Sequence, residues 1–105
     1  MKRTLINLTP HPIVISGHET IDPSGYIARV NLQLCQVGEV NGIPLMISKN
    51  LGVCNLPDPQ PNTMYIVPAM VRNQITDRTD LCSPAKLIRN AHGGVVACSA
   101  LEVNP

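Results

Sequence analysis

Several polar and titratable side chains could serve a binding or catalytic site, and His11 is the first along the chain. It stands between Pro10 and Pro12 in the stretch N-L-T-P-H-P-I. Pro12 favours an extended backbone at His11 and Pro10 has a fixed backbone angle, so the imidazole has few directions in which to point. Two interpretations follow. One is a strand kink held by local hydrogen bonds from Asn7 or Thr9. The other is a pre-oriented hydrogen-bonding group or base that faces a pocket.

Arginines supply the second kind of chemistry, because their planar fork fits a phosphate or a carboxylate. Arg29 is the only cation on an amphipathic segment, and Arg89 precedes a glycine-rich turn. Arg78 precedes Asp80 in R-T-D-L-C-S-P. Each has an ordinary interpretation as well: a solvated charge for Arg29 and Arg89, and a loop brace for the Arg78–Asp80 pair. Asp80 could also bond a ribose or orient a base, and the turn at Ser24–Gly25 could add an anion-binding nest of backbone N–H groups.

Established enzyme and metal motifs do not accompany these residues. The sequence lacks G-x-x-x-x-G-K, G-x-G-x-x-G, H-E-x-x-H and G-x-S-x-G. It has no C-x-x-C pair, and its three histidines are not at ligand spacing, so neither a metal nor another cofactor is expected. No secretion signal or stretch of roughly 18 apolar residues stands out. We therefore expect a cytoplasmic protein whose cysteines remain buried or partly buried thiols, at Cys35, Cys54, Cys82 and Cys98.

Length and composition predict one β-rich domain, residues 1–105, with an aliphatic core. Hydrophobic residues make up 44% and charged residues 14%, values that suit a folded chain. Tyr26 and Tyr65 are the only aromatic residues, which argues against a platform for stacking single-stranded bases. The net charge of +1 argues against duplex nucleic acid. A small anionic ligand needs only two or three placed cations and stays open.

Prolines and glycines divide the chain into short apolar segments that are typical of strands. We expect about seven short strands from eight candidate segments: Thr4–Leu8, Ile13–Ser16, Tyr26–Leu34, Cys35–Val40, Ile43–Ile47, Met64–Val67, Lys86–Arg89 and Val95–Cys98, the last of which could run on to Val103. An Asn-Gly turn links the fourth and fifth of these segments, and "NAHGG" links the last two. The clearest amphipathic face is formed by Ala28, Val30, Leu32 and Leu34.

The connections between these segments are also predicted. Leu56–Thr63 is proline-rich and cannot be an inner strand, and Asp77–Pro84 is expected to be a polar loop. Ala69–Ile75 is expected to form one or two helical turns, with Pro68 suited to the start. Together the segments predict a mainly β fold, a small antiparallel barrel or sandwich with at most one short helix.

Five short patterns together resemble a group of small phage, prophage and bacterial proteins of about this length. They are N-L-T-P-H at 7–11, P-S-G-x-x-A-R-V at 23–30, T-x-Y-I-V at 63–67, R-x-D-L-x-x-P at 78–84, and an arginine–turn–glycine hairpin ending in cysteine at 89–98. They cover nearly the whole chain. One departure is Pro68, where the group's pattern has a serine. The resemblance implies a phage or prophage context rather than an activity. Its shared polar residues are His11, Ser24, Arg29, Thr63, Arg78, Asp80 and Arg89.

The leading hypothesis is a small non-enzymatic binding protein of phage or prophage origin, in the cytoplasm of the bacterial host. Its ligand would be a small anion such as a nucleotide. Some small phage proteins sequester nucleotide signals of host immunity, and the shared phage context makes them an analogy for this chain. A small barrel has little room for a deep cavity, so we expect a homo-oligomer with a site shared between subunits. The candidate ligand-binding residues are Thr9, His11, Ser24, Arg29, Arg78, Asp80 and Arg89.

Two other hypotheses stay open. The second is a structural or protein-interaction module, such as a virion accessory protein or a binder of a host partner. The third is a small nucleotide hydrolase or lyase, in which His11 is the general acid or base and Arg29 or Arg78 stabilises developing charge. Duplex nucleic acid and membranes are not expected partners in any of the three.

Overall fold

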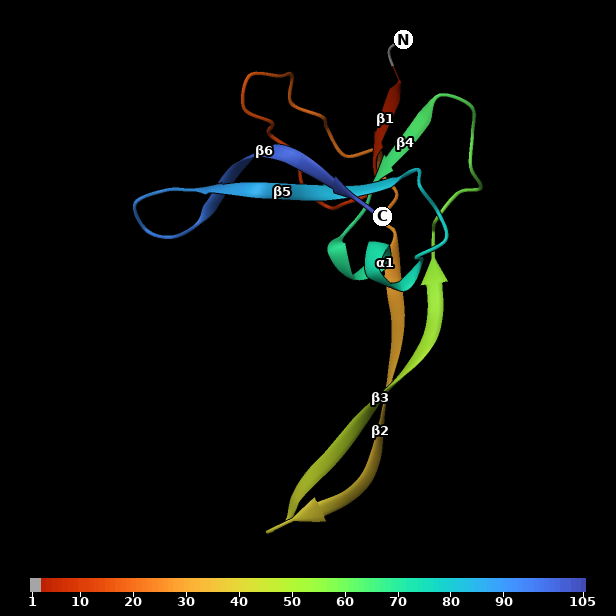
Figure 1. Cartoon of the computed structure of the whole chain (residues 1–105). Helices are drawn as coiled ribbons and strands as arrows, with labels where there is room; N and C mark the ends of the chain where they lie inside the picture. Colours follow the sequence, from red (N-terminus) through yellow and green to blue (C-terminus); the bar gives the residue numbers. More distant parts are fainter. Residues whose placement is uncertain (1–2) are drawn as a thin grey trace.

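A small β-rich body and a long projecting β-hairpin make up the protein (Figure 1). The computed structural model describes residues 3–105. The elements are β1 (Thr4–Asn7), β2 (Arg29–Val40), β3 (Ile43–Cys54), β4 (Thr63–Ile66), α1 (Ala69–Gln74), β5 (Leu81–Arg89) and β6 (Val95–Val103). The prediction of a mainly β fold with one short helix is confirmed, with six strands in place of about seven.

The strands form two separate sheets. β1, β4, β5 and β6 lie in that order in a four-stranded sheet, and β2 and β3 form a two-stranded sheet. β4 pairs in parallel with both β1 and β5, so the prediction of a purely antiparallel fold is wrong. The named strands also do not close into a barrel. The strands β1 and β4 are distant in sequence, and the direction in which such strands pair leaves no local signal.

Two cores lie on opposite faces of the four-stranded sheet because neighbouring residues of a strand point to opposite sides. Tyr65 and Val67 contribute to one core, and Ile66 between them contributes to the other. The first core, which also holds Val71 of α1, consists of Leu8, Ala28, Tyr65, Val67, Val71 and Leu81. The second consists of Ile13, Ile15, Ile66, Cys82 and Cys98. Both cores are aliphatic apart from Tyr65 and the two cysteines, as the composition predicts.

The predicted strand Ile13–Ser16 is absent. Ile13 and Ile15 instead make isolated bridges, to Ile21 and to Cys98 respectively. Pro12 immediately before this segment has no N–H to donate, and Gly17 immediately after it turns the chain at φ +80°. Ile13 and Ile15 pair with two different segments, so the residues between Pro12 and Gly17 form no continuous ladder with either one.

The predicted loop Asp77–Pro84 is also only partly correct, because β5 begins inside it at Leu81. Pro84 belongs to β5 and is opposite Leu101 of β6. The pairing of β5 with β4 ends at Cys82, so beyond that point β5 has a neighbouring strand on one side only. Pro84 lacks an N–H group, but at such an edge position it breaks no inner ladder.

The β2–β3 hairpin, residues 29–54, is called the arm below. The segments predicted as Tyr26–Leu34 and Cys35–Val40 join into the single strand β2, which begins at Arg29. The predicted Asn-Gly turn is present, with positive φ values of 51° at Asn41 and 80° at Gly42 that suit a tight hairpin turn. The proline-rich connection at Leu56–Thr63, the helix after Pro68 and the last turn at Asn90–Gly94 are likewise confirmed.

Candidate functional site

The turn at N-L-T-P-H is held by the side chain of Asn7. The Asn7 amide nitrogen donates to the backbone oxygens of His11 (2.8 Å) and Ile21 (3.0 Å). Its amide oxygen accepts from the backbone N–H (2.9 Å) and the hydroxyl (2.6 Å) of Thr9. Asn7 and Thr9 are both buried. These are the local hydrogen bonds expected for a strand kink, and they use the carbonyl of His11, not its ring.

The exposed His11 lies beside an apolar groove. The groove has a volume of about 410 Å³ and is lined mainly by His11, Pro12, Ile13, Val14, Leu87 and Val95. None of Arg29, Arg78 and Arg89 contributes to its lining. Neither arginine that the hydrolase hypothesis combines with His11, Arg29 or Arg78, thus contributes to the groove beside it.

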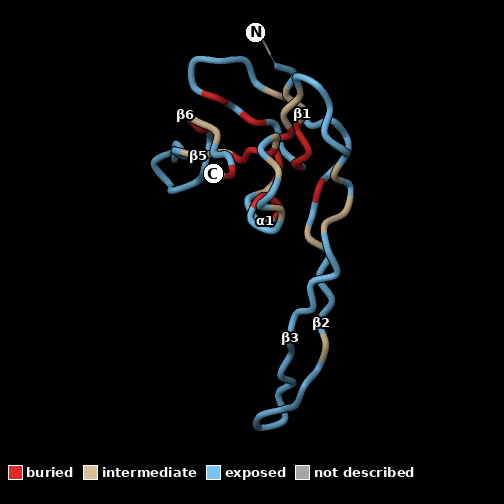
Figure 2. Tube along the Cα trace, turned by 45° about the vertical axis from the view of Figure 1, so that its right-hand side comes forward, coloured by how far each residue is buried: buried red, intermediate tan, exposed pale blue. Residues whose placement is uncertain are grey.

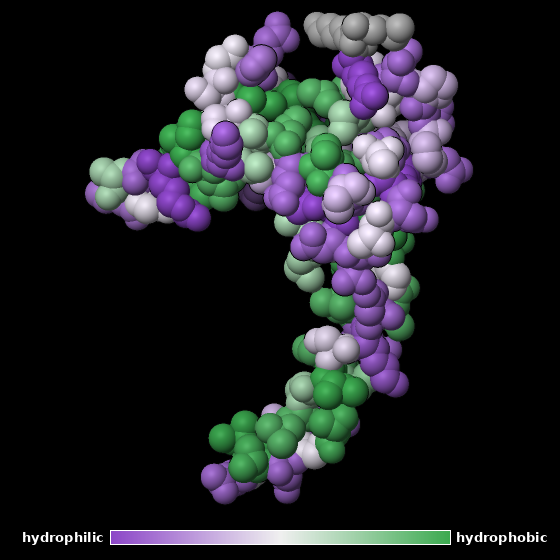
Figure 3. Space-filling model, viewed as in Figure 1, coloured by the Kyte–Doolittle hydropathy of each residue, from purple (hydrophilic) through white to green (hydrophobic). Residues whose placement is uncertain are grey.

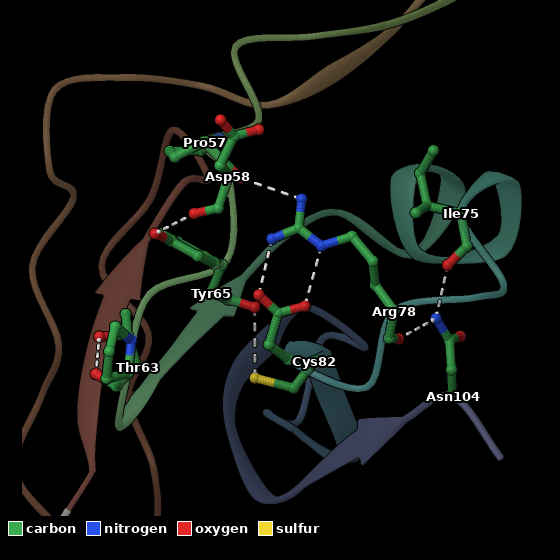
Figure 4. Close-up of polar contacts among 10 residues, drawn as sticks. Pro57, Asp58, Thr63, Tyr65, Ile75, Arg78, Cys82 and Asn104 are labelled. Atoms are coloured by element: carbon green, nitrogen blue, oxygen red, sulfur yellow. Dashed lines mark hydrogen bonds and ion pairs between the residues drawn. The ribbon is translucent and has the colours of Figure 1, made fainter.

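Arg78 and Asp80 form a bidentate ion pair, and Figure 4 shows Arg78 between Pro57, Tyr65 and Asn104. Nε of Arg78 donates to Oδ1 of Asp80 at 2.9 Å, and Nη2 donates to Oδ2 at 2.6 Å. Nη1 donates to the carbonyl of Pro57 at 2.9 Å. The guanidinium carbon lies 5.8 Å from the centre of the Tyr65 ring, within range of a cation–π contact.

This pair fixes the charge of both partners. The hydrogen bond from Arg78 lowers the pKa of Asp80, against the opposing effect of burial. The same hydrogen bond raises the pKa of Arg78. The side chains are only 16% and 18% exposed, and all three guanidinium nitrogens are engaged. The pair therefore has the geometry of the predicted loop brace, and it leaves little of Arg78 for a ligand.

Ser24 lies in a second groove, next to the Arg78–Asp80 pair. Its hydroxyl accepts from the N–H of Tyr26 at 3.3 Å. The groove has a volume of about 630 Å³ and is lined by Ile6, Leu8, Ser24, Tyr26, Asn55, Leu56, Pro57, Gln60 and Tyr65. Pro57 and Tyr65 are shared between this lining and the surroundings of Arg78. Tyr26 is 71% exposed and no lining residue is charged, so the groove suits a neutral, partly apolar group.

The two remaining arginines lie on other parts of the molecule. Arg29 is exposed at the start of β2, where it pairs with Cys54 at the root of the arm. Arg89 is exposed at the end of β5, and its Nη1 donates to the carbonyl of Gly93 within the last hairpin turn. Within residues 3–105 the three candidate arginines thus belong to three sites and do not form one cationic cleft.

Arg72 of α1 is a buried polar residue that the sequence did not single out. It is 8% exposed. Its Nε donates to the hydroxyl of Ser83 at 2.8 Å, its Nη1 to Oδ1 of Asn104 at 3.3 Å, and its Nη2 lies 3.3 Å from Oε1 of Glu102. The one available signal is its position beside Val71, at the edge of the apolar stripe of the helix.

The arm carries half of the exposed large apolar residues among residues 3–105. Its distal half is exposed throughout apart from Cys35 (Figure 2), and apolar side chains gather at its far end (Figure 3). The apolar face predicted from Ala28 to Leu34 is buried at its start and exposed at its end. Ala28 is fully buried, whereas Leu34 is 66% exposed. The exposed large apolar residues of the arm are Leu32, Leu34, Val37, Val40, Ile43, Leu45, Met46, Ile47 and Leu51.

The cysteines are free thiols, as expected. Cys82 and Cys98 are buried, whereas Cys35 and Cys54 are partly buried. Burial raises the pKa of the Cys82 thiol to about 11, so that it stays protonated at neutral pH. Across residues 3–105, no three His, Cys, Asp or Glu side chains converge on a point that could hold a metal ion. In the same range, no helix has the length and apolar character needed to cross a bilayer.

Comparison with known proteins adds no relative. No family model matches the chain, and no match was found among curated proteins or among solved structures.

Proposed function

We propose that this chain is a small non-enzymatic binding protein whose main binding element is the arm. One observation carries the proposal: a hairpin with twelve residues in each strand projects from the body with a largely apolar, exposed surface. A two-stranded hairpin is marginally stable at best in water unless another surface packs on it. Large apolar patches on a folded protein mark sites of interaction with other macromolecules. This surface favours the protein-interaction hypothesis, in the phage or prophage context that the resemblance implies.

A second candidate function is the binding of a small anion, such as a nucleotide, between copies of the chain. Arg29 favours it. Its guanidinium is exposed, and it takes no part in the ion pairs among residues 3–105. Arg29 stands at the root of the arm, where a second copy could bring another cation close. The groove at Ser24 and Tyr26 would then hold the uncharged part of the ligand. The hydrolase hypothesis has less support, because neither Arg29 nor Arg78 lines the groove beside His11.

Isolated bridges in the body of the protein support the prediction of a small barrel. Isolated bridges join Pro23 to Asn7 of β1 and Ile15 to Cys98 of β6, at the two edges of the four-stranded sheet. A third bridge joins Ile13 to Ile21. We infer that residues 13–23 connect the two edges and turn the open sheet into a barrel-like ring. The second core, which contains Ile13 and Ile15, would be its interior.

Hydrogen exchange combined with native mass spectrometry tests the proposed function. A formed binding element predicts slow exchange of the arm amides, whereas exchange at unstructured rates would contradict it. A panel of linear and cyclic nucleotides then separates the two candidates. If the protein interacts only through the arm, native mass spectrometry should find no nucleotide adduct. An adduct of unchanged mass that Arg29→Ala weakens would support anion binding, and consumption of a nucleotide would contradict the non-enzymatic proposal.

A further inference from the structure

The distal half of the arm has one apolar face and one more polar face. Residues that are opposite each other in an antiparallel pair lie on the same face, and successive pairs alternate between faces. The pairs Cys35–Ile47, Gly38–Leu45 and Val40–Ile43 fall on one side. The pairs Gln36–Met46 and Glu39–Pro44 fall on the other. We define the apolar face as Cys35, Val40, Ile43, Leu45 and Ile47.

The apolar face is open to water in a single copy. Val40, Ile43, Leu45 and Ile47 are between 45% and 62% exposed. Only two strands form this sheet, and nothing else among residues 3–105 covers its distal part (Figures 1 and 2). A ribbon that is solvated on both sides has no need to separate apolar from polar residues. The separation therefore indicates that one face packs against another surface.

The amount of exposed surface fits an obligate partner. The chain exposes 7252 Å², whereas a compact monomer of this mass exposes about 5,700 Å². Its radius of gyration is 16.8 Å, against about 13 Å for a compact domain of this length. The whole chain, with both the arm and the β5–β6 hairpin, exceeds the compact value by about 1,500 Å², and an obligate homodimer removes a comparable area from each subunit.

We propose that the apolar face packs on the same face of a second copy, so that two arms form a two-fold symmetric dimer. This inference rests on the proposed function and names the partner of the arm. A two-fold axis brings a surface against its own copy, so a charged surface would repel itself. The apolar face carries no charged residue from Cys35 to Ile47, and Glu39 belongs to the opposite side. Two such sheets would stack about 10 Å apart, as in a β-sandwich.

Neighbouring positions on the arm provide a matched pair of variants. Leu45 and Met46 are 45% and 46% exposed and lie on opposite faces. Leu45→Lys would place two ammonium groups in the dry interface, whereas Met46→Lys keeps its charge in water. Light scattering after gel filtration should find dimers for the wild type and Met46→Lys. Leu45→Lys should be a monomer, with dimer affinity reduced roughly 100-fold or more.

Cys35 gives a second measurement that needs no variant. It lies on the apolar face opposite Ile47, whereas Cys54 lies at the root of the arm. Dilution of the wild type below its dimer dissociation constant should speed alkylation of Cys35 and leave Cys54 unchanged. Leu45→Lys should speed it at any concentration.

A wild-type monomer whose arm amides exchange slowly would overturn the dimer and leave the arm as a binding element for another partner. An arm that exchanges at unstructured rates would overturn both proposals. Equal loss of dimer in the two lysine variants would show that the apolar face is not the interface. If Leu45→Lys failed to fold, a rate of Cys35 alkylation independent of dilution would still contradict the dimer.

Discussion

Asn7 shows how polar residues that could serve a ligand instead hold the body together. Its side chain bonds to backbone groups of Thr9 and His11 in the first turn and of Ile21 beyond it, and it is almost fully buried. The Arg78–Asp80 pair does the same for the segment before β5. The pattern around His11 could be recognised from the sequence. The turn uses the backbone carbonyl of His11 and not its ring. The spacing of the residues alone does not reveal that this carbonyl accepts a hydrogen bond from the side chain of Asn7.

Asn7→Ala should lower the free energy of unfolding by about 2–4 kcal/mol, because the buried N–H of Thr9 loses its acceptor and the carbonyls of His11 and Ile21 each lose one of two donors. His11→Ala is the control and should change it by no more than about 0.5 kcal/mol, because its exposed ring makes no hydrogen bond among residues 3–105. Urea denaturation of both variants measures the difference. An equal loss in the two would mean that the imidazole also supports the fold.

Asp80→Asn should lower stability by about 1–3 kcal/mol at pH 7, because the charged hydrogen bonds to Arg78 are weakened. The pKa of Asp80 is lower in the folded state than in the unfolded chain. Its contribution is therefore complete above the unfolded pKa of about 4 and is lost as the pH falls through the folded value. Urea midpoints from pH 7 to pH 2.5 should show the wild type and the variant converging in acid. A constant gap would contradict this assignment.

The short helix α1 depends on its contacts with the sheet. A helix of six residues is not stable alone, and Val71 and Arg72 are its buried residues. Its position was predictable from Pro68 and the apolar spacing that follows. The role of Arg72 was not, because Ser83, Glu102 and Asn104 approach it only in the folded chain. The places of β1, β4 and β6 were predictable for the same local reasons, whereas the end of β3, the start of β5 and the parallel pairing were not.

Arg72→Ala should lower the free energy of unfolding by about 2–4 kcal/mol, because Ser83 and Asn104 lose a buried partner. Asn73→Ala changes the neighbouring exposed position of the same helix and should cost less than about 0.5 kcal/mol. Thermal unfolding followed by circular dichroism compares the two variants. Similar midpoints would contradict the view that Arg72 fastens α1 to β5 and β6.

The molecule as a whole is extended, with principal dimensions of 57 × 39 × 27 Å. Alternating apolar residues predicted one face through Ala28, Val30, Leu32 and Leu34, of which Ala28 lies in the first core and Val30 packs against it. The same alternation continues into the arm, where the body no longer covers it. A strand covered by its own core and one covered by a second copy have the same sequence pattern. The sequence therefore predicted a homo-oligomer only from the lack of room for a cavity, and the interface that we propose lies on the arm.

The mass of the wild-type protein in solution tests the arm-mediated dimer most directly. Analytical ultracentrifugation at micromolar concentration should give twice the chain mass of 11.3 kDa for the wild type and Met46→Lys, and the single chain mass for Leu45→Lys. A wild-type protein that remains at 11.3 kDa up to the highest soluble concentration would contradict the account.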